Sequence, residues 1–276
     1  MNSITRTPLR VRHQTRLRLV QVIRVEQISP RMRRITFADD ALEDFASAAA
    51  DDHVKLLFLP DREQNLPVLD RPALPTSGPD GFVFPQGVQA ITRDYTPRRF
   101  DLKTCELVIE FVLHGDGPAS EWAAQARPGE WIGIVGPRGS LLIPDDYDAY
   151  LLVGDETALP AIARRLEEMP PGVCVMAVIE VADRHEERHL PTAANARITW
   201  LHRDSMPAGT AVLLEECLKS LTFPKGDIHA WIAGEIEVAR RLRHYLIDER
   251  GLSRSQIKAA GYWRRGEPGA HAKIED

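Results

Sequence analysis

The residues best suited to chemistry lie in the run Arg93-Asp94-Tyr95-Thr96-Pro97-Arg98, at the start of a predicted strand. An arginine guanidinium is planar and always charged, so it binds two phosphate oxygens at once. Tyr95 adds a flat ring and Thr96 a hydroxyl. These groups match what a flavin dinucleotide requires: an aromatic partner for the isoalloxazine, donors for the ribityl chain and cations for the pyrophosphate. Alone, the run would better suit a strand edge with solvated arginines.

A second candidate segment covers residues 114–123, which follow a predicted strand and open a predicted helix. Unpaired backbone N–H groups at a helix N-terminus attract anions, and glycine allows a phosphate to approach the backbone closely. The segment could be a plain capped helix. Beside Arg93 and Arg98, a pyrophosphate site near Ala119 and Ser120 is an equally good interpretation.

A third candidate is the turn Gly154-Asp155-Glu156-Thr157, which directly follows a short apolar strand. In open α/β sheets ligands bind beyond the carboxyl ends of the strands, where this turn and the turn at Gly234-Glu235 should both lie. Two such turns predict a crevice for a nicotinamide nucleotide. The chain has neither GxGxxG nor GxxxxGK[ST], so an ordinary dinucleotide fingerprint and an NTPase loop are both excluded.

The elements that must position these residues fall into two styles. Up to about residue 143 the chain has short apolar or alternating runs separated by Pro, Gly and Asp, which predicts a small antiparallel barrel. Residues 60–90, rich in proline, predict a long flexible insertion. Strands are expected within 17–30, 33–37, 53–59, 90–96, 104–113 and 131–135.

From about residue 145 strands alternate with helices, which predicts a parallel sheet with helices on its faces. Strands are expected at 150–154, 172–181, 198–202 and 229–234, and helices at 158–169, 210–221 and 237–248. The expected architecture is therefore an antiparallel β-barrel over residues 16–144, followed by an α/β domain over residues 145–276.

Composition narrows the class of protein. The chain has 276 residues, 43% hydrophobic and 27% charged, with a net charge of -5, which argues against general nucleic-acid binding. No apolar run approaches the ~20 residues of a membrane span, and no apolar segment follows Met1. The three scattered cysteines suggest a reduced, cytoplasmic protein without a metal cluster. Nine arginines and one acid in residues 1–36 suggest a frayed basic tail leading into an edge strand.

The motifs in order resemble one family. RxYTxR, GPASxWA, GDETALPA, AGE and the segment 261–266 (Gly-Tyr-Trp-Arg-Arg-Gly) are similar to the siderophore-interacting proteins, which are ferric-siderophore reductases of the ferredoxin–NADP⁺ reductase superfamily. The resemblance covers residues 16–270 and implies an FAD-binding barrel followed by an NAD(P)H-binding α/β domain.

Carried over by position, the resemblance assigns cofactor contacts along the chain. It places the flavin against Tyr95 and the flavin phosphates near the arginines, and it places nicotinamide nucleotide at the strand-end turns. The C-terminal segment would cover the active-site region, with Tyr262 and Trp263 either stacking on a cofactor or plugging the core. The residues assigned to cofactors are Arg93, Tyr95, Thr96, Arg98, His114, Gly117, Pro118, Ala119, Ser120, Trp122, Gly154, Asp155, Glu156, Thr157, Gly234 and Glu235.

The substrate that the resemblance implies is a ferric siderophore, which is often anionic, so cations beside the flavin should attract it. Lys55 and Arg138 are the first candidates, and Lys258 and Arg264 are weaker ones. The implied reaction moves electrons from NADPH or NADH through FAD to Fe(III), without a protein nucleophile or base. A ferredoxin donor stays open. Two alternatives are a siderophore carrier with structural FAD, and a general flavin or ferredoxin-type reductase.

Overall fold

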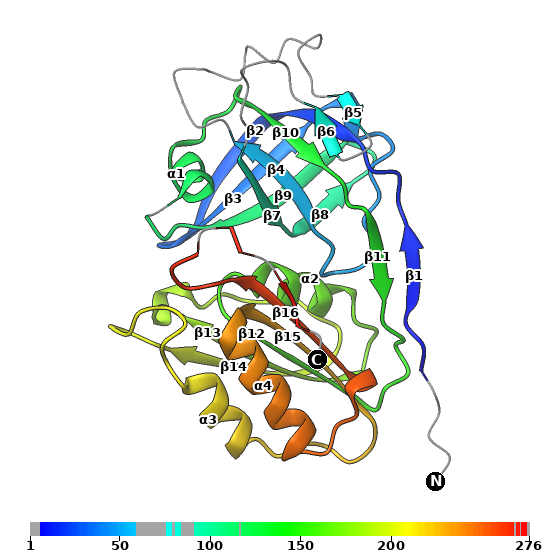
Figure 1. Ribbon diagram of the computed structural model, residues 1–276, viewed down its shortest axis with the longest axis vertical. Helices are drawn as coiled ribbons and strands as arrows, with labels where there is room; N and C mark the ends of the chain where they lie inside the picture. The colour runs from blue at the N-terminus through cyan, green and yellow to red at the C-terminus, as the bar shows by residue number, and fades with distance from the viewer. Residues whose placement is uncertain are drawn as a thin grey trace.

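The computed structural model describes residues 6–58, 76–78, 81–83, 91–115, 117–267, 269–270 and 272–274. Figure 1 shows a curled antiparallel sheet above a second sheet that is covered by helices. This is the expected order of a barrel followed by an α/β domain. The chain passes from one to the other between β11 (Gly139–Leu142) and β12 (Ala149–Gly154).

The barrel domain is built on one seven-stranded sheet whose paired strands are all antiparallel. Its order is β7-β4-β10-β2-β3-β9-β8. In the first half of β2 alternate residues are buried, as expected for a strand with one face on the core. The strands are β2 (Leu17–Ser29), β3 (Met32–Ala38), β4 (Val54–Phe58), β7 (Ile91–Tyr95), β8 (Pro97–Asp101), β9 (Glu106–Val112) and β10 (Trp131–Val135).

The two edge strands of this sheet are consecutive in the chain. β7 ends at Tyr95 and β8 begins at Pro97, so the chain crosses from one edge to the other at Thr96. Pro97 also lies at a register shift where β8 pairs with β9. The sequence pattern predicts one strand over 90–96, whereas the structure has β7 and a separate strand, β8. The sheet therefore curls so that its two edge strands are joined within the RxYTxR segment, residues 93–98.

Helix α1 (Pro118–Gln125) packs on the barrel through Trp122. The indole of Trp122 lies 6.2 Å from the ring of Phe37 and 5.7 Å from those of Phe58 and Phe111, centroid to centroid. Large aromatic surfaces of this kind contribute most of the burial in a small core. The helix is thus fixed at the end of β9, after residues 114–117.

The second domain has a six-stranded sheet in the order β14-β13-β12-β15-β16-β17, parallel except for the last pair. Helix α2 lies on the side of this sheet that faces the barrel, and α3 and α4 cover the other side (Figure 1). The expected strands and helices are confirmed, and β16 was missed. Further elements are α2 (Leu159–Glu168), β13 (Cys174–Val181), β14 (Asn195–His202), α3 (Leu213–Ser220), β15 (Ile228–Glu235), α4 (Ile236–Asp248), β16 (Ile257–Trp263) and β17 (Ala272–Lys273).

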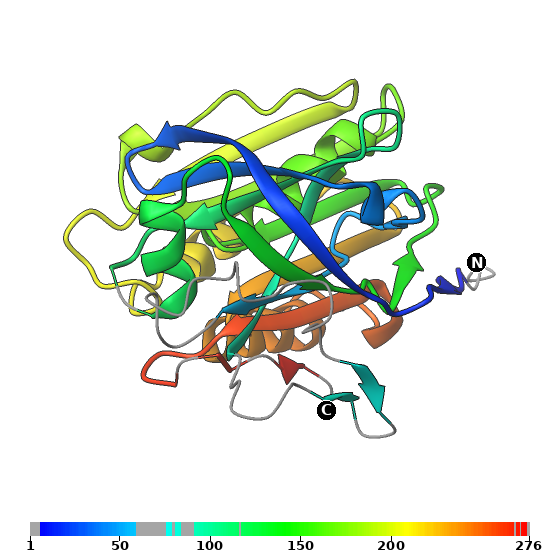
Figure 2. The ribbon, with the colours of Figure 1, turned by 90° about the horizontal axis from the view of Figure 1, so that it is seen from above.

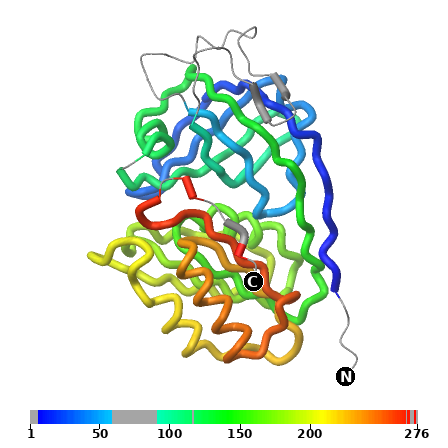
Figure 3. Tube along the Cα trace, in the orientation of Figure 1, coloured from blue at the N-terminus to red at the C-terminus, as the bar shows by residue number. Residues whose placement is uncertain are grey.

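The basic N-terminal segment contains an ordered strand. β1 (Leu9–Arg12) pairs with β11, and this ribbon leaves the barrel and runs down beside the second sheet (Figure 3). Beyond it, Arg6 Nη1 donates to Asp227 over 2.6 Å, and its guanidinium stacks 4.6 Å from the Tyr147 ring. The frayed tail expected from the sequence is therefore wrong for residues 6–12, because Arg6 binds the second domain and residues 9–12 pair with β11.

The insertion expected at 60–90 is described only in part. The view from above in Figure 2 shows the short hairpin of β5 (Thr76–Gly78) and β6 (Gly81–Val83) at the rim of the molecule. The rest of the insertion expected at 60–90 lies outside the described residues. Cys105, Cys174 and Cys217 are free thiols, as expected. In the described part of the chain, no helix is long and apolar enough to cross a bilayer.

Candidate functional site

Tyr95 ends strand β7 at the rim of the barrel. One side of its ring packs against Phe111, with 4.4 Å between ring centroids, while the side chain as a whole is only half-buried. Burial raises the pKa of its phenol well above the usual value, so the hydroxyl stays protonated. Tyr95 can therefore offer a fixed aromatic surface and a hydroxyl donor to a ligand.

Arg93 lies two residues earlier on the same strand and bends toward the C-terminal segment. Its Nη1 donates to the Thr92 carbonyl over 2.9 Å. A Cβ at Gly269 would lie 2.9 Å from Arg93 Nη1, and the φ of +79° at this position favours glycine. The half-buried guanidinium retains N–H groups that can bind an anion.

The start of α1 has the features of an anion site. Gly117 precedes the helix at φ +89°, and no side chain caps the first turn. Ser120 is buried, and its Oγ accepts a hydrogen bond from the His114 N–H over 3.0 Å, which holds the preceding loop. Uncapped N–H groups at Ala119 and Ser120 can therefore face a phosphate. Trp122 points the other way, into the barrel core.

The barrel motif reaches the second domain through the C-terminal segment. Thr96, buried at the crossing between β7 and β8, forms a side-chain hydrogen bond with Tyr262. The next residue, Trp263, donates its indole N–H to Asp155 Oδ2 over 2.7 Å. Two consecutive residues of β16 thus join the RxYTxR motif to the strand-end turn.

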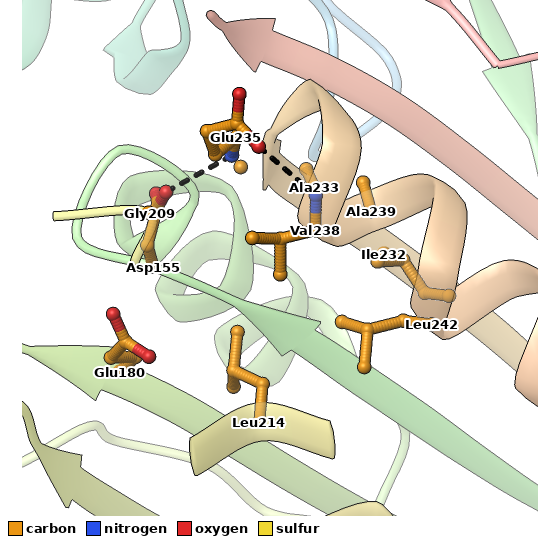
Figure 4. Close-up of a pocket in the computed structure, with 11 residues that line it drawn as sticks. Asp155, Glu180, Gly209, Leu214, Ile232, Ala233, Glu235, Val238, Ala239 and Leu242 are labelled. Carbon is orange, nitrogen blue, oxygen red and sulfur yellow. Dashed lines mark hydrogen bonds between the residues drawn. The ribbon is translucent and has the colours of Figure 1, made fainter. Parts of the chain in front are cut away.

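The two predicted strand-end turns form a single crevice. Gly154 and Ala233 are register partners, and Asp155 Oδ2 accepts from the Glu235 N–H over 3.2 Å. A Cβ at Gly234, where φ is +147°, would lie 2.8 Å from the same oxygen. Figure 4 shows the resulting pocket between the sheet and α4, with the carboxylates of Asp155, Glu180 and Glu235 on its lining.

The carboxylates of this pocket differ in their partners. Asp155 accepts from Thr157 as well as from Trp263 and Glu235, and Glu235 caps α4 through the N–H groups of Glu237 and Val238 at 2.8 and 3.0 Å. Glu180 is buried, and none of the described residues donates a hydrogen bond to its side-chain carboxylate. Glu180 is thus the pocket carboxyl with hydrogen-bonding capacity left for a ligand.

Burial and mutual repulsion raise the pKa of two of these groups. Burial is the main cause, and the charge of Glu156 the next, that raises the pKa of Asp155 to about 6. For Glu180, burial is again the main cause, and the charge of Asp155 the next, that raises the pKa to about 7. Glu156 itself forms a buried, two-pronged ion pair with Arg203. The pocket can therefore hold a proton near neutral pH.

Arg98 lies in the interface between the domains. Its guanidinium is buried and pairs with Glu167 of α2, with Nη1 2.8 Å from Oε2. The other arginine of the motif, Arg93, is half-buried at the barrel rim. The structure therefore places the two arginines of RxYTxR in different surroundings.

Three of the four candidate substrate cations lie on the barrel or pair with it. Lys55 Nζ lies 2.7 Å from Asp94 Oδ1, and Lys258 Nζ lies 2.5 Å from Asp51 Oδ2. Arg138 follows strand β10, whose Val135 is the register partner of Lys55, and its exposed side chain has no partner among the described residues.

The fourth cation, Arg264, pairs with a different set of residues: Glu237 at 3.5 Å and Glu267 at 3.3 Å. The structure therefore brings Lys55 and Arg138 to one end of the barrel and ties Arg264 to α4.

Sequence reasoning left several residues of this region unassigned. Trp231 donates its indole N–H to Asp51 over 2.9 Å, next to the Lys258 pair. Gly209 lies against Glu235 and Trp263, where a Cβ would meet them at 2.8 and 3.1 Å. Glu180 is the exception, since an acid near the end of the predicted strand 172–181 is a candidate to bond a ribose hydroxyl. No sequence pattern marks the other residues, which reach the site only in the folded protein.

The comparison with family models covers both halves of this arrangement. Residues 21–141 match the siderophore-interacting FAD-binding domain, and residues 147–266 match the siderophore-interacting protein model. The chain belongs to the siderophore-interacting protein family. The expectation from the motifs is confirmed, and the two matches meet where β11 gives way to β12.

Individual relatives agree along their whole length. An NADPH-dependent ferric-chelate reductase of Escherichia coli is 36% identical over 266 residues, which is 95% of this chain and 99% of the relative. The ferric vibriobactin reductase ViuB of Vibrio cholerae is 31% identical, covering 91% of this chain and 90% of the relative. The crystal structure of a siderophore utilization protein from T. fusca aligns with a TM-score of 0.86 and 40% identity, covering 96% and 98% of the two chains.

The residues present fit FAD, the cofactor of the family's first domain. The fit rests on the uncapped start of α1 with Gly117, on the half-buried ring of Tyr95 and on the available guanidinium of Arg93. These three features supply N–H donors, an aromatic face and a cation around one end of the barrel. The strand-end crevice with Glu180 and Gly234 is acidic, so its charge disfavours the phosphates of a nicotinamide nucleotide.

Proposed function

We propose that this chain is an FAD-dependent ferric-siderophore reductase, which takes electrons from NADPH and releases iron as Fe(II). The observation that carries the proposal is the short connection from Thr96 through Tyr262 and Trp263 to Asp155. It puts the flavin motif of the barrel beside the nucleotide crevice of the second domain. A reductase needs its electron donor and its flavin in contact, and this connection supports such contact.

FAD, when bound, supplies the change from two-electron to one-electron chemistry that joins a nicotinamide donor to Fe(III). Tyr95 and the start of α1 would hold it, and Arg93 would neutralise phosphate charge. Tyr262 and Trp263 exclude water between the domains because their side chains fill the space beside Thr96 and Asp155. The protein residues bind and orient, and no nucleophile or base is required of them.

Lys55 and Arg138 would attract the anionic ferric siderophore to the barrel rim. Their exposed side chains allow a large chelate to reach them from solvent. Release follows from reduction, since Fe(II) is softer than Fe(III) and binds hard oxygen ligands less tightly. The names of the relatives support this class of substrate and support NADPH as the donor. We place the reaction in the cytoplasm, where three free thiols would stay reduced.

The proposal is tested by mixing the FAD-loaded protein with NADPH without oxygen and following the visible absorption of the flavin. Loss of that absorption, and its return when a ferric siderophore is added, is the expected result. A carrier with structural FAD would bind the siderophore but would keep its absorption in the presence of NADPH. A general flavin reductase would be bleached but would pass electrons to free flavin as fast as to a ferric siderophore.

The Tyr95→Ala variant examines the barrel site directly. We expect the dissociation constant for FAD to rise roughly tenfold or more, because the variant removes the aromatic face that the flavin needs. Tyr245→Ala provides the matched control, since Tyr245 lies on α4 and contacts Leu218 of α3. Equal FAD affinity in the two variants would remove Tyr95 from the site.

A further inference from the structure

Arg98 and Glu167 connect the two domains where β8 meets α2. Arg98 Nη1 donates to Glu167 Oε2 over 2.8 Å and Nη2 donates to Oε1 over 2.5 Å, so both oxygens of the carboxylate are engaged. This parallel arrangement is the strongest geometry that arginine forms with a carboxylate. Figure 1 shows α2 between the barrel and the second sheet, which is where the pair lies.

A second glutamate completes a buried cluster around Arg98. Its Nε lies 3.6 Å from Glu110 Oε1, and Glu110 has a fully buried side chain. Glu110 accepts from Arg34 Nη2 at 2.6 Å and from Arg188 Nη2 at 2.5 Å. Arg34, Arg98 and Glu110 belong to the barrel, whereas Glu167 and Arg188 belong to the α/β domain. The cluster therefore closes across the interface.

The charges of the cluster suit this closed arrangement. Burial alone would lower the pKa of Arg98, but the hydrogen bonds that it donates to Glu167 and the charge of Glu110 raise it. Arg98 in turn lowers the pKa of Glu167. Removing one partner leaves the other charge without compensation in the interface, which is costly.

Arg164 provides a second attachment on the same face of α2, one turn before Glu167. Its Nη1 donates to the Pro97 carbonyl over 2.9 Å, and its Nη2 donates to the Ser47 carbonyl over 2.9 Å. Pro97 is the residue between Thr96 and Arg98. The start of β8 is thus held to α2 at two adjacent residues.

The position of α2 matters because both attached elements begin at candidate site residues. The helix follows the turn at 154–157 directly, and β8 follows Tyr95 and Thr96 directly. The contact between Arg98 and Glu167, together with the bonds of Arg164, therefore holds the strand after Tyr95 and Thr96 to the helix after the turn at 154–157.

We propose that Arg98 is a positioning residue that clamps α2 to β8, and that it is not a ligand of the FAD phosphates. This inference rests on the proposed function only where its test measures reaction rates. It divides the RxYTxR motif by role: Arg93 and Tyr95 serve the cofactor, and Arg98 sets how the nucleotide domain faces it. The competing assignment, carried over from the family motif, makes Arg98 a phosphate ligand.

The experiment compares Arg98→Ala, Glu167→Gln and the double variant, with Arg99→Ala as control. Arg99 is the exposed neighbour on β8. Three quantities are measured: the dissociation constant for FAD, the rate of flavin bleaching by NADPH, and the rate at which chemically reduced flavoprotein passes electrons to a ferric siderophore. Urea unfolding of the FAD-free proteins provides a fourth, independent readout.

We expect both single variants to slow bleaching by NADPH on the order of tenfold, and the double variant to be about as slow as Arg98→Ala, because both single variants break the contact between Arg98 and Glu167, and only Arg98→Ala also removes the charge beside Glu110. FAD affinity should change less than roughly threefold. Electron transfer from reduced flavin to the ferric siderophore should match the wild type. In urea, the loss of unfolding free energy in the FAD-free double variant should likewise be smaller than the sum of the losses in the two single variants.

Two results would overturn the clamp. The first is a large loss of FAD affinity in Arg98→Ala that Glu167→Gln does not reproduce, which identifies a phosphate ligand. The second is bleaching by NADPH at the wild-type rate in all variants. If the wild-type protein itself is not bleached, the proposed function fails. The urea data then decide on the clamp separately, with additive single variants counting against it.

Discussion

The indole N–H of Trp263 donates to Oδ2 of Asp155 over 2.7 Å, although 108 residues separate the two in the chain. This hydrogen bond joins the last long strand of the sheet to the turn after its first strand. It also brings the C-terminal segment over the crevice, because Trp263 lies against Gly209 beside Glu235. The bond lowers the pKa of Asp155, opposing the larger effect of burial.

Replacing Trp263 with Phe should destabilise the protein by about 1–3 kcal/mol at pH 8, because a buried carboxylate loses a donor. Urea unfolding measures the change. Trp200→Phe is a suitable control, since the Trp200 side chain is half-buried in β14 and its indole donates to none of the described residues. Equal losses in both variants would show that the hydrogen bond contributes nothing beyond indole packing.

Gly154→Ala should disturb the crevice more than its size suggests. The added Cβ would lie 2.4 Å from the Ala158 Cβ and 2.6 Å from the Ala233 carbonyl oxygen, so β12 and β15 would have to separate. Overpacking of this kind costs about 1–3 kcal/mol. We expect a lower melting temperature and weaker NADPH binding, measured by calorimetry.

Gly133→Ala, in the barrel, is the control for this change. Its Cβ would meet neighbours at 3.4 Å, an ordinary contact, and the variant should melt within a few degrees of the wild type. Unchanged NADPH affinity in Gly154→Ala would mean that the nucleotide does not approach this turn.

The sequence predicts those parts of the site that depend on local pattern. Strands β12 and β15 are apolar runs that end near Gly154 and Gly234, so the pattern of the chain alone is enough to place their turns at one sheet edge. The start of α1 is found in the same way. Local pattern also predicts the barrel, although it merges the crossing at Thr96 into one strand and misses β8.

The contacts that join the domains could not be predicted. Glu167 reads as a solvated acid on an amphipathic helix, and nothing near it in the chain indicates a buried partner 69 residues earlier. Arg98 was assigned to a phosphate because arginine binds carboxylate and phosphate with the same planar geometry. Asp51 and Trp231 are likewise joined only by the packing of one domain on the other.

Asp155 and Glu180 should each contribute more stability as the pH falls from 8 toward 5. The pKa values of Asp155 and Glu180 are raised to about 6 and about 7 in the folded protein, above the usual values of 3.8 and 4.5. The folded state therefore binds protons more tightly, and the penalty of the two charges is removed as the pH passes below the raised values. Glu180→Gln should flatten this dependence, measured as the melting temperature of the FAD-free protein from pH 5 to 8. A slope unchanged by Glu180→Gln would assign the effect to other groups.

Substrate binding should respond to Arg138 and Asp94 in opposite directions. Arg138→Ala removes an exposed cation, so the KM for an anionic ferric chelate should rise roughly threefold to tenfold. Asp94→Asn releases Lys55 from a carboxylate 2.7 Å away, so the same KM should fall. Both effects should shrink at high salt, because exposed charges are screened. A neutral ferric chelate is the control substrate and should show the wild-type KM with both variants. If Asp94→Asn raises the KM for the anionic chelate, the pair with Lys55 orders the lysine for binding, and it does not compete with the substrate.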